Sequence, residues 1–181
     1  MEKKDIRRFS ILVAIIAAAA ATRWIPHIPN VTPMIAIALF GGVHFGQKRW
    51  AITLPLAAMV ISDLGLELLS GNGFHSDMPA VYLCMLAITG LGFVLKQNSR
   101  IAPIAGATLL ASTLFFIVTN FSVWAFGSLY PKTFSGLATC YIAAIPYFGN
   151  ALMGDVFYTA LLFGGYALAS RQFPALASRT A

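Results

Sequence analysis

The stretch TRWIPHIPNVTPMIAIALFGG, Thr22 to Gly42, joins two apolar runs through a connection of polar residues and proline. It contains three prolines, a histidine, an asparagine and two threonines, none of which a simple turn between membrane helices needs. The prolines exclude a continuous helix. Thr32 followed by Pro33 is typical of a helix N-cap and a first helical residue. We therefore expect a rigid connection that leads into a second helix.

The composition is typical of a membrane protein. The chain has 181 residues, of which 59% are hydrophobic and 10% are charged, and its mean hydropathy is +0.79. A soluble domain would carry about 25% charged residues. Because the few charges are clustered between long apolar runs, we predict a single all-α, polytopic membrane domain over residues 1–181.

Apolar windows predict six transmembrane helices, and we expect the first to be a retained helix and not a cleaved signal. The windows are residues 8–24, 33–45, 50–69, 79–95, 101–126 and 139–169. The second window is short for a hydrocarbon core of about 30 Å. In the last window, PYFGN (146–150) predicts a break, with Asn150 as the N-cap of the helix that follows.

The basic residues define an orientation. Ten of the twelve lysines and arginines lie at the chain ends and in the second and fourth connections: Lys3, Lys4, Arg7, Arg8, Lys48, Arg49, Lys96, Arg100, Arg171 and Arg179. Only Arg23 and Lys132 fall on the other side. The positive-inside rule places both termini in the cytoplasm. The net charge of +6 is then a topology signal, and we expect no nucleic-acid partner.

Acidic residues gather on the opposite, outer side. Those beyond the N-terminal tail are Asp63, Glu67, Asp77 and Asp155. A carboxylate inside a span costs about 2.5–3.5 kcal/mol on insertion scales, so it needs a partner or a wet cavity. Asp63 and Asp155 lie inside predicted spans, which predicts a polar pocket open to the outside. Two alternatives remain open: Asp63 pairs with Arg23 or caps backbone, and Asp155 interacts with a helix dipole.

The candidate binding residues surround this expected pocket and include aromatic and amide side chains suited to a flat polar ligand. They are His27, Asn30, Asp63, His75, Tyr82, Cys84, Asn120, Trp124, Asn150 and Asp155. Ordinary structural explanations stand beside this one: Trp124 is also typical of the membrane interface, and a loop histidine such as His75 is usually only solvated. Cys84 and Cys140 lie in or beside apolar runs, so we expect no disulfide.

The first helix carries small residues four positions apart, Ala14 with Ala18 and Ala17 with Ala21. Such pairs let helices approach closely in lipid, either within the bundle or at a docking surface for a partner membrane protein. The sequence has no phosphate-binding loop, no HExxH pair and no GxSxG elbow. We predict that the protein is not an enzyme and has no intrinsic cofactor.

Three stretches resemble a family of small bacterial membrane proteins related to the substrate-binding S components of energy-coupling-factor (ECF) vitamin transporters. They are RWIPHIPNVTPMIAIALFGGVHF (23–45), PLAAMVISDLGLELLSGNGFHSDMPAVY (55–82) and LFFIVTNFSVWAFGSLYPKTFSGLATCYIAAIPYFGNALMGDVFY (114–158). The resemblance implies a six-helix bundle with a vitamin-like ligand near the outer face. It also implies that the alanines of the first helix dock an ECF-type coupling subunit.

Within this group the chain looks most like the solitary cobalamin transporters of Gram-negative bacteria. His27, Asp63 and Tyr82 match a histidine, an aspartate and a tyrosine that recur there. The resemblance implies cobalamin as the transported ligand, with a cysteine, here Cys84, as the residue that would bind its cobalt. His75 is the alternative, because imidazole also suits such metals.

The sequence therefore predicts a membrane transport protein that takes up a vitamin-like or cofactor-precursor molecule, with cobalamin the leading candidate. Two alternatives stay open. An intramembrane enzyme would hold His27, His75 and Asp63 within ligand or hydrogen-bond distance of one another. A structural membrane subunit would use the polar residues only for caps and helix contacts.

Overall fold

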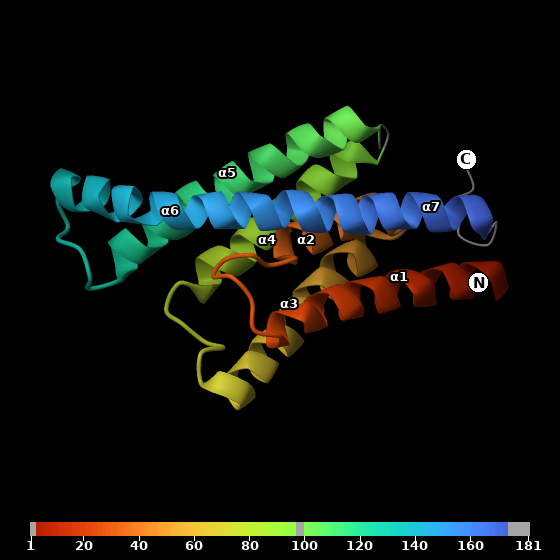
Figure 1. Ribbon diagram of the computed structural model, residues 1–181, viewed down its shortest axis with the longest axis horizontal. Coiled ribbons are helices and arrows are strands. Elements are labelled where there is room, and N and C mark those ends of the chain that lie inside the picture. The colour runs from red at the N-terminus through yellow and green to blue at the C-terminus, as the bar shows by residue number, and fades with distance from the viewer. Residues whose placement is uncertain (1–2, 97–99, 174–181) are drawn as a thin grey trace.

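The computed structural model describes residues 3–96 and 100–173, and every regular element within these ranges is helical. The helices are α1 (Lys3–Ala21), α2 (Met34–His44), α3 (Lys48–Ser70), α4 (Met78–Leu95), α5 (Ile101–Phe126), α6 (Phe134–Thr159) and α7 (Gly165–Gln172). A 3₁₀ turn, η1 (Thr22–Trp24), follows α1, and a π-helical turn, η2 (Ala160–Gly164), joins α6 to α7 without a gap. Residues 25–33, the hinge, connect η1 to α2 (Figure 1).

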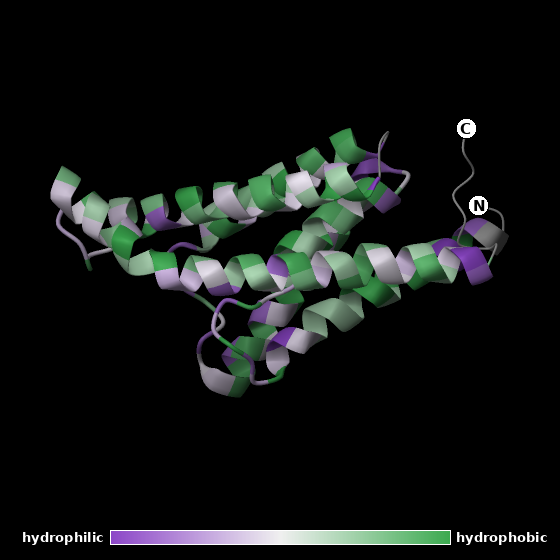
Figure 2. Ribbon diagram, turned by 45° about the horizontal axis from the view of Figure 1, so that its top comes forward, coloured by the Kyte–Doolittle hydropathy of each residue, from purple (hydrophilic) through white to green (hydrophobic). Residues whose placement is uncertain are grey.

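Four helical segments of the described chain are long and apolar enough to cross a membrane. They are α3, α4, α5 and the continuous rod Phe134–Gln172. Their outward faces carry large apolar side chains, for example Ile61 of α3, Leu110 of α5 and Phe157 of α6. Figure 2 shows apolar residues along these helices, with hydrophilic residues concentrated at the start of α1 and in connections. An apolar surface of this extent is the kind that lipid covers, so the protein belongs to the membrane class.

The second predicted span is a short helix enclosed by the bundle. Helix α2 has 11 residues and contacts α3, α4 and α6, and every residue from Met34 to Val43 is buried. At 1.5 Å per residue it is about 16 Å long, roughly half of a 30 Å hydrocarbon core. Its apolar residues face neighbours on all sides, as expected of a fully buried helix.

The predicted break at residues 146–150 is wrong. Helix α6 runs through Pro146, and Asn150 lies inside it instead of capping a new helix. Contacts to α5 secure the helix before and after the proline: Tyr141 Oη donates to the carbonyl of Ile117 at 2.7 Å, and the Phe148 ring lies 4.7 Å from that of Phe116. In membrane helices such neighbours make an internal proline tolerable. The irregular turn falls at η2 instead.

The start of α1 and helix α7 lie at one end of the molecule, and the α5–α6 connection lies at the other (Figure 1). Two of the predicted cytoplasmic residues, Arg8 and Lys96, bind adjacent carbonyls where α2 ends: Arg8 donates to the carbonyl of His44 at 3.0 Å and Lys96 to that of Phe45 at 3.3 Å. Arg179 lies outside the described residues.

Helix α1 has some of its alanines on the buried face and others on the exposed face. Leu12, Ile16, Ala19 and Ala20 form its buried face, whereas Ala14, Ala17 and Ala18 are exposed and Ala21 is half-buried. Packing within this chain therefore does not explain the three exposed alanines.

Candidate functional site

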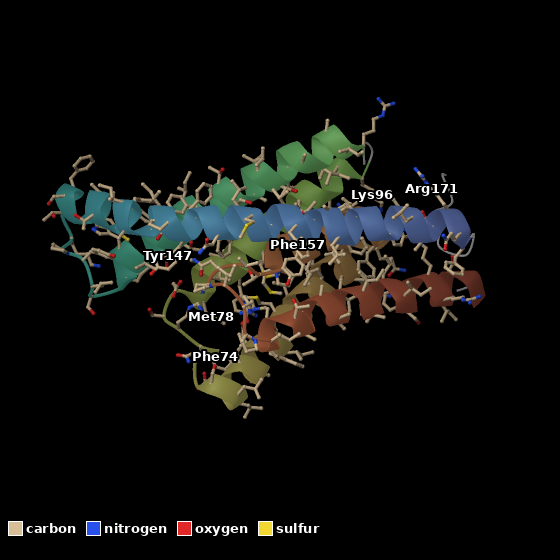
Figure 3. The ribbon with its side chains drawn as sticks, in the orientation of Figure 1. Phe74, Met78, Lys96, Tyr147, Phe157 and Arg171 are labelled. Atoms are coloured by element: carbon tan, nitrogen blue, oxygen red, sulfur yellow. The ribbon has the colours of Figure 1, made fainter. Side chains whose placement is uncertain are left out.

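A cavity of about 360 Å³ lies between the hinge, α3, the start of α4, α5 and α6. Tyr147, which is labelled in Figure 3, is one of its lining residues. Its polar lining residues are Arg23, Asn30, Thr32, His75, Asp77, Ser112, Thr119, Asn120 and Asp155. Its aromatic lining residues are Phe115, Phe116, Tyr147 and Phe148. A concave apolar site with a few polar groups is the usual form of a small-molecule site.

The hinge shapes one wall of this cavity by a tight turn. The amide of Val31 donates to the carbonyl of Ile28 at 3.1 Å, and Asn30 has a φ of +67°. Proline at the second position and a positive φ at the third are features of a type II turn, for which asparagine is tolerated. The expected helix start is displaced by one residue: Pro33 is the N-cap, without a side-chain bond, and Thr32 lines the cavity.

Arg23 lines the cavity and also belongs to a buried hydrogen-bond network with residues of α3 and α4. Its Nη1 donates to Asp63 Oδ1 at 2.7 Å and to Ser62 Oγ at 3.0 Å, while Tyr82 Oη donates to Asp63 Oδ2 at 2.9 Å. The Asp63 side chain is 1% exposed and that of Arg23 12%. Of the two alternatives for Asp63, the geometry supports the pairing with Arg23. Asp63 thus positions the cation that reaches the cavity.

The α3–α4 loop closes another side with a histidine–aspartate pair. His75 Nδ1 lies 2.7 Å from Asp77 Oδ1, and the two side chains are 48% and 24% exposed. Glu67 holds the same loop, because its carboxylate accepts from the amides of Gly73 at 2.9 Å and Phe74 at 3.3 Å. The loop that carries His75 is therefore bonded to the end of α3 and not merely solvated.

Asp155 lies on the α6 wall and is buried, with 3% of its surface exposed. Its Oδ2 accepts a 2.7 Å hydrogen bond from Ser112 of α5. One helical turn away, Thr108, which precedes Ser112 on α5, donates to Thr159, which follows Asp155 on α6, at 3.3 Å. These four residues form a polar seam between α5 and α6. Asp155 lies well inside the last helical rod and not at its N-terminus, so the helix-dipole explanation does not hold.

The structure brings together only some of the predicted binding residues. Asn30, His75, Asn120 and Asp155 line the cavity, and Asp63 and Tyr82 adjoin it through Arg23. Four other predicted binding residues do not line the cavity: His27, Cys84, Trp124 and Asn150.

The physical reasons differ from one of these four residues to the next. His27 is exposed on the hinge, with its Nδ1 2.6 Å from the carbonyl of Ile25. Cys84 packs in the hydrophobic core, 2% exposed, and both it and Cys140 are free thiols, as expected. Trp124 donates to the carbonyl of Pro131 at 2.9 Å and so supports the α5–α6 connection. Asn150 lies on a face of α6 that the cavity does not reach.

Several lining residues were missed, although their spacing contained a signal. On α5 the cavity is lined by Ser112, Phe115, Phe116, Thr119, Asn120 and Val123, and on α6 by Ala144, Tyr147, Phe148, Ala151 and Asp155. Both sets follow the three- and four-residue spacing of one helix face. In a helix that is apolar throughout, such a face is hard to recognise from the sequence, because few of its residues are polar.

The three residues of the enzyme alternative do not converge. His27, His75 and Asp63 each contact a different partner. Within the described ranges, no group of three or more His, Cys, Asp or Glu residues could hold a metal ion.

Gly154, beside Asp155, lets the hinge pack on α6. A Cβ at this position would lie 2.9 Å from Val31 Cα and 3.1 Å from the amide nitrogen of Thr32. We expect Gly154→Ala to push the hinge away from the cavity and to lower the free energy of unfolding by about 1–3 kcal/mol, as overpacking does. Unfolding in mixed micelles titrated with SDS measures this change. Gly149→Ala on the same helix is the matched control, since its Cβ meets nothing within 4 Å; an equal effect of both changes would contradict the role of the hinge contact.

Comparison with known proteins identifies a family for this chain. No curated protein and no solved structure matches the chain. One family profile matches residues 3–176, a range that contains every helix the structure describes. The chain therefore belongs to DUF6580, a family of unknown function.

Proposed function

We propose that this protein is a membrane transport protein that receives a small, vitamin-like molecule in the cavity between the hinge, α5 and α6, and helps to move it inward. The observation that carries the proposal is a cavity of about 360 Å³ whose wall includes a buried carboxylate inside an apolar helix. Such a carboxylate is expensive in a membrane protein and usually marks a ligand or ion path.

In this proposal six helical passes form one bundle with both termini in the cytoplasm. Helix α2 is too short to cross alone, so the extended hinge completes its pass. Irregular backbone at membrane depth is tolerated where it lines a cavity, and the hinge residues Asn30 and Thr32 do so. The positive-inside rule then places the cavity on the outer side.

The volume favours a ligand of one or two rings. The cavity volume of about 360 Å³ lies near the lower end of the 300–1,000 Å³ typical of small-molecule sites. Cobalamin, the ligand that the resemblance implies, is much larger than the cavity, so only part of the molecule would fit inside it. Of its two proposed cobalt-binding residues, His75 lines the cavity and Cys84 does not.

A coupling partner is part of the proposal. Transport against a gradient needs an energy source, and the exposed alanines of α1, Ala14, Ala17 and Ala18, offer a surface on which another membrane helix could pack closely. An ECF-type coupling subunit, which the resemblance implies, would use that surface.

Ligand-induced stabilisation tests the binding step. The purified protein in mild detergent is heated with a small-molecule extract of bacterial cells and, separately, with riboflavin, biotin, pyridoxine and cobalamin. A ligand present at 100 times its Kd stabilises by about 2.7 kcal/mol, which raises the unfolding temperature by several degrees. We expect the extract to do so, and mass spectrometry of the bound fraction then identifies the molecule.

A matched pair of variants locates the binding. Ala144 lines the cavity, whereas its neighbour Ala143 is exposed on the outer face of α6. We expect Ala144→Phe to fill the cavity and remove the stabilisation, and Ala143→Phe to preserve it. Stabilisation that survives in both variants, or that no extract produces in the wild type, would overturn the proposed function.

A further inference from the structure

The charges around the cavity leave one carboxylate without a cation. The guanidinium of Arg23 is 2.7 Å from Asp63, and the imidazole of His75 is 2.7 Å from Asp77. No described Lys, Arg or His forms an ion pair with Asp155, and Ser112 is its hydrogen-bond donor. Three carboxyl groups thus lie at or beside the cavity wall with one permanent cation, and Asp155 is the one for which the described residues supply no ion pair.

Burial makes an ionised form of Asp155 costly. Asp155 is 3% exposed, and a buried carboxylate is strongly destabilising unless it is paired or protonated. One neutral hydroxyl at 2.7 Å satisfies only one of the several acceptor sites of a carboxylate. The side chain therefore has capacity for a further donor, and the cavity that it lines is where a ligand can supply one.

Aromatic rings line the walls near the same carboxylate. Phe115 and Phe116 lie about one helical turn from Ser112 on α5, and Phe148 lies two turns from Asp155 on α6. The rings of Phe116 and Phe148 are 4.7 Å apart. Ring faces attract cations, more strongly when water is excluded, and they stack on planar ligands. A carboxylate combined with ring faces is a recurrent arrangement for binding positively charged organic molecules.

We propose that the ligand of this cavity is an organic cation, a small nitrogen heterocycle or amine whose positive group lies against Asp155 while its apolar part lies among the phenylalanines. This proposal rests on the proposed function and specifies the chemical class of the molecule. Arg23 does not repel such a ligand strongly, because Asp63 already neutralises it.

Fractionation by charge tests the class even while the molecule itself is unidentified. The bacterial extract is separated into cation-exchange, anion-exchange and unretained fractions, and each is tested for thermal stabilisation of the wild-type protein in detergent. We expect the stabilising component in the fraction retained by the cation exchanger. Its appearance in another fraction would overturn the cationic class and leave the proposed function intact. Stabilisation by no fraction would overturn both.

The affinities of three defined ligands that share one ring and differ in charge give a second test. 1-Methylnicotinamide is a cation, nicotinamide is neutral and nicotinate is an anion, and all three are small enough for the cavity. We expect the cation to bind at least ten times more tightly than the other two. Equal affinities, or tighter binding of nicotinate, would contradict the proposal.

The variant Asp155→Asn connects the preference to this residue. It removes the charge but keeps an oxygen that can accept from Ser112, so we expect it to fold and to lose at least tenfold in affinity for the cation, with nicotinamide affinity within threefold of the wild type. Thr113→Ala, at an exposed position next to Ser112, is the control and should retain the preference. A cation preference that persists in Asp155→Asn would show that another group selects the charge. If that variant does not fold, the fractionation and the ring series still decide the proposal on the wild type.

Discussion

Asp63→Ala is expected to lower the free energy of unfolding by about 3–5 kcal/mol, the usual cost of removing one partner from a buried ion pair. The change leaves the Arg23 guanidinium, only 12% exposed, without its carboxylate at 2.7 Å, and it also removes the acceptor of the Tyr82 hydroxyl. Unfolding by SDS in mixed micelles, followed by tryptophan fluorescence, measures the loss.

Two comparisons make this result specific. Replacing both partners by apolar residues, as in Arg23→Met with Asp63→Leu, should recover most of the stability, because no charge is then left buried. Asp77→Asn removes a more exposed pair, with side chains 48% and 24% exposed, and should cost at most about 1 kcal/mol. If Asp63→Ala were no worse than Asp77→Asn, the buried network would not be what holds η1 against α3.

Gly92→Ala is expected to separate α2 from α4. A Cβ at Gly92 would lie 2.7 Å from the carbonyl oxygen of Leu39 and 2.9 Å from Gly42 Cα, and a Cβ at Gly42 would lie 2.8 Å from Gly92 Cα. These are backbone atoms that no side-chain rotation can move. We therefore expect a loss at the upper end of the roughly 1–3 kcal/mol that overpacking costs, seen as a lower SDS midpoint in the same micelle titration.

Gly90 on the same helix supplies the matched control. Its Cβ would meet nothing within 4 Å, and alanine is a better helix former than glycine by up to about 1 kcal/mol. Gly90→Ala should therefore be neutral or stabilising. A similar loss in both variants would indicate that helix propensity, and not the α2–α4 approach, governs this segment.

The local helix signals were informative where the neighbouring helices did not override them. Windows at 79–95 and 101–126 agree within one residue with α4 (Met78–Leu95) and α5 (Ile101–Phe126), because charged or proline-containing connections interrupt the apolar runs. Pro146 misled for the opposite reason. A proline removes one backbone donor, but contacts of α6 with α5 compensate for that loss, and such contacts are not visible in a local window.

The sequence predicted the kind of site, a polar pocket within apolar helices, but only some of the residues that line it. Asp63 and Asp155 were identified because carboxylates in apolar runs are costly, and one of them does line the cavity. His27 and Trp124 were chosen for their chemistry, yet their hydrogen bonds go to nearby backbone carbonyls. Which face of a uniformly apolar helix lines a cavity depends on its packing partners, and for α5 and α6 these lie far away in the sequence.

The sequence by itself determined an all-helical membrane protein with clustered basic residues and two carboxylates that need compensation, because composition, apolar run length and the cost of burying charge are properties of the residues themselves. Only the tertiary structure decided that Arg23 compensates Asp63, that no cation among the described residues pairs with Asp155, and that α2 is enclosed by other helices instead of facing lipid. The physical reason is that pairing and burial depend on which segments meet in space, and residues 40 positions apart must meet before a charge finds its partner.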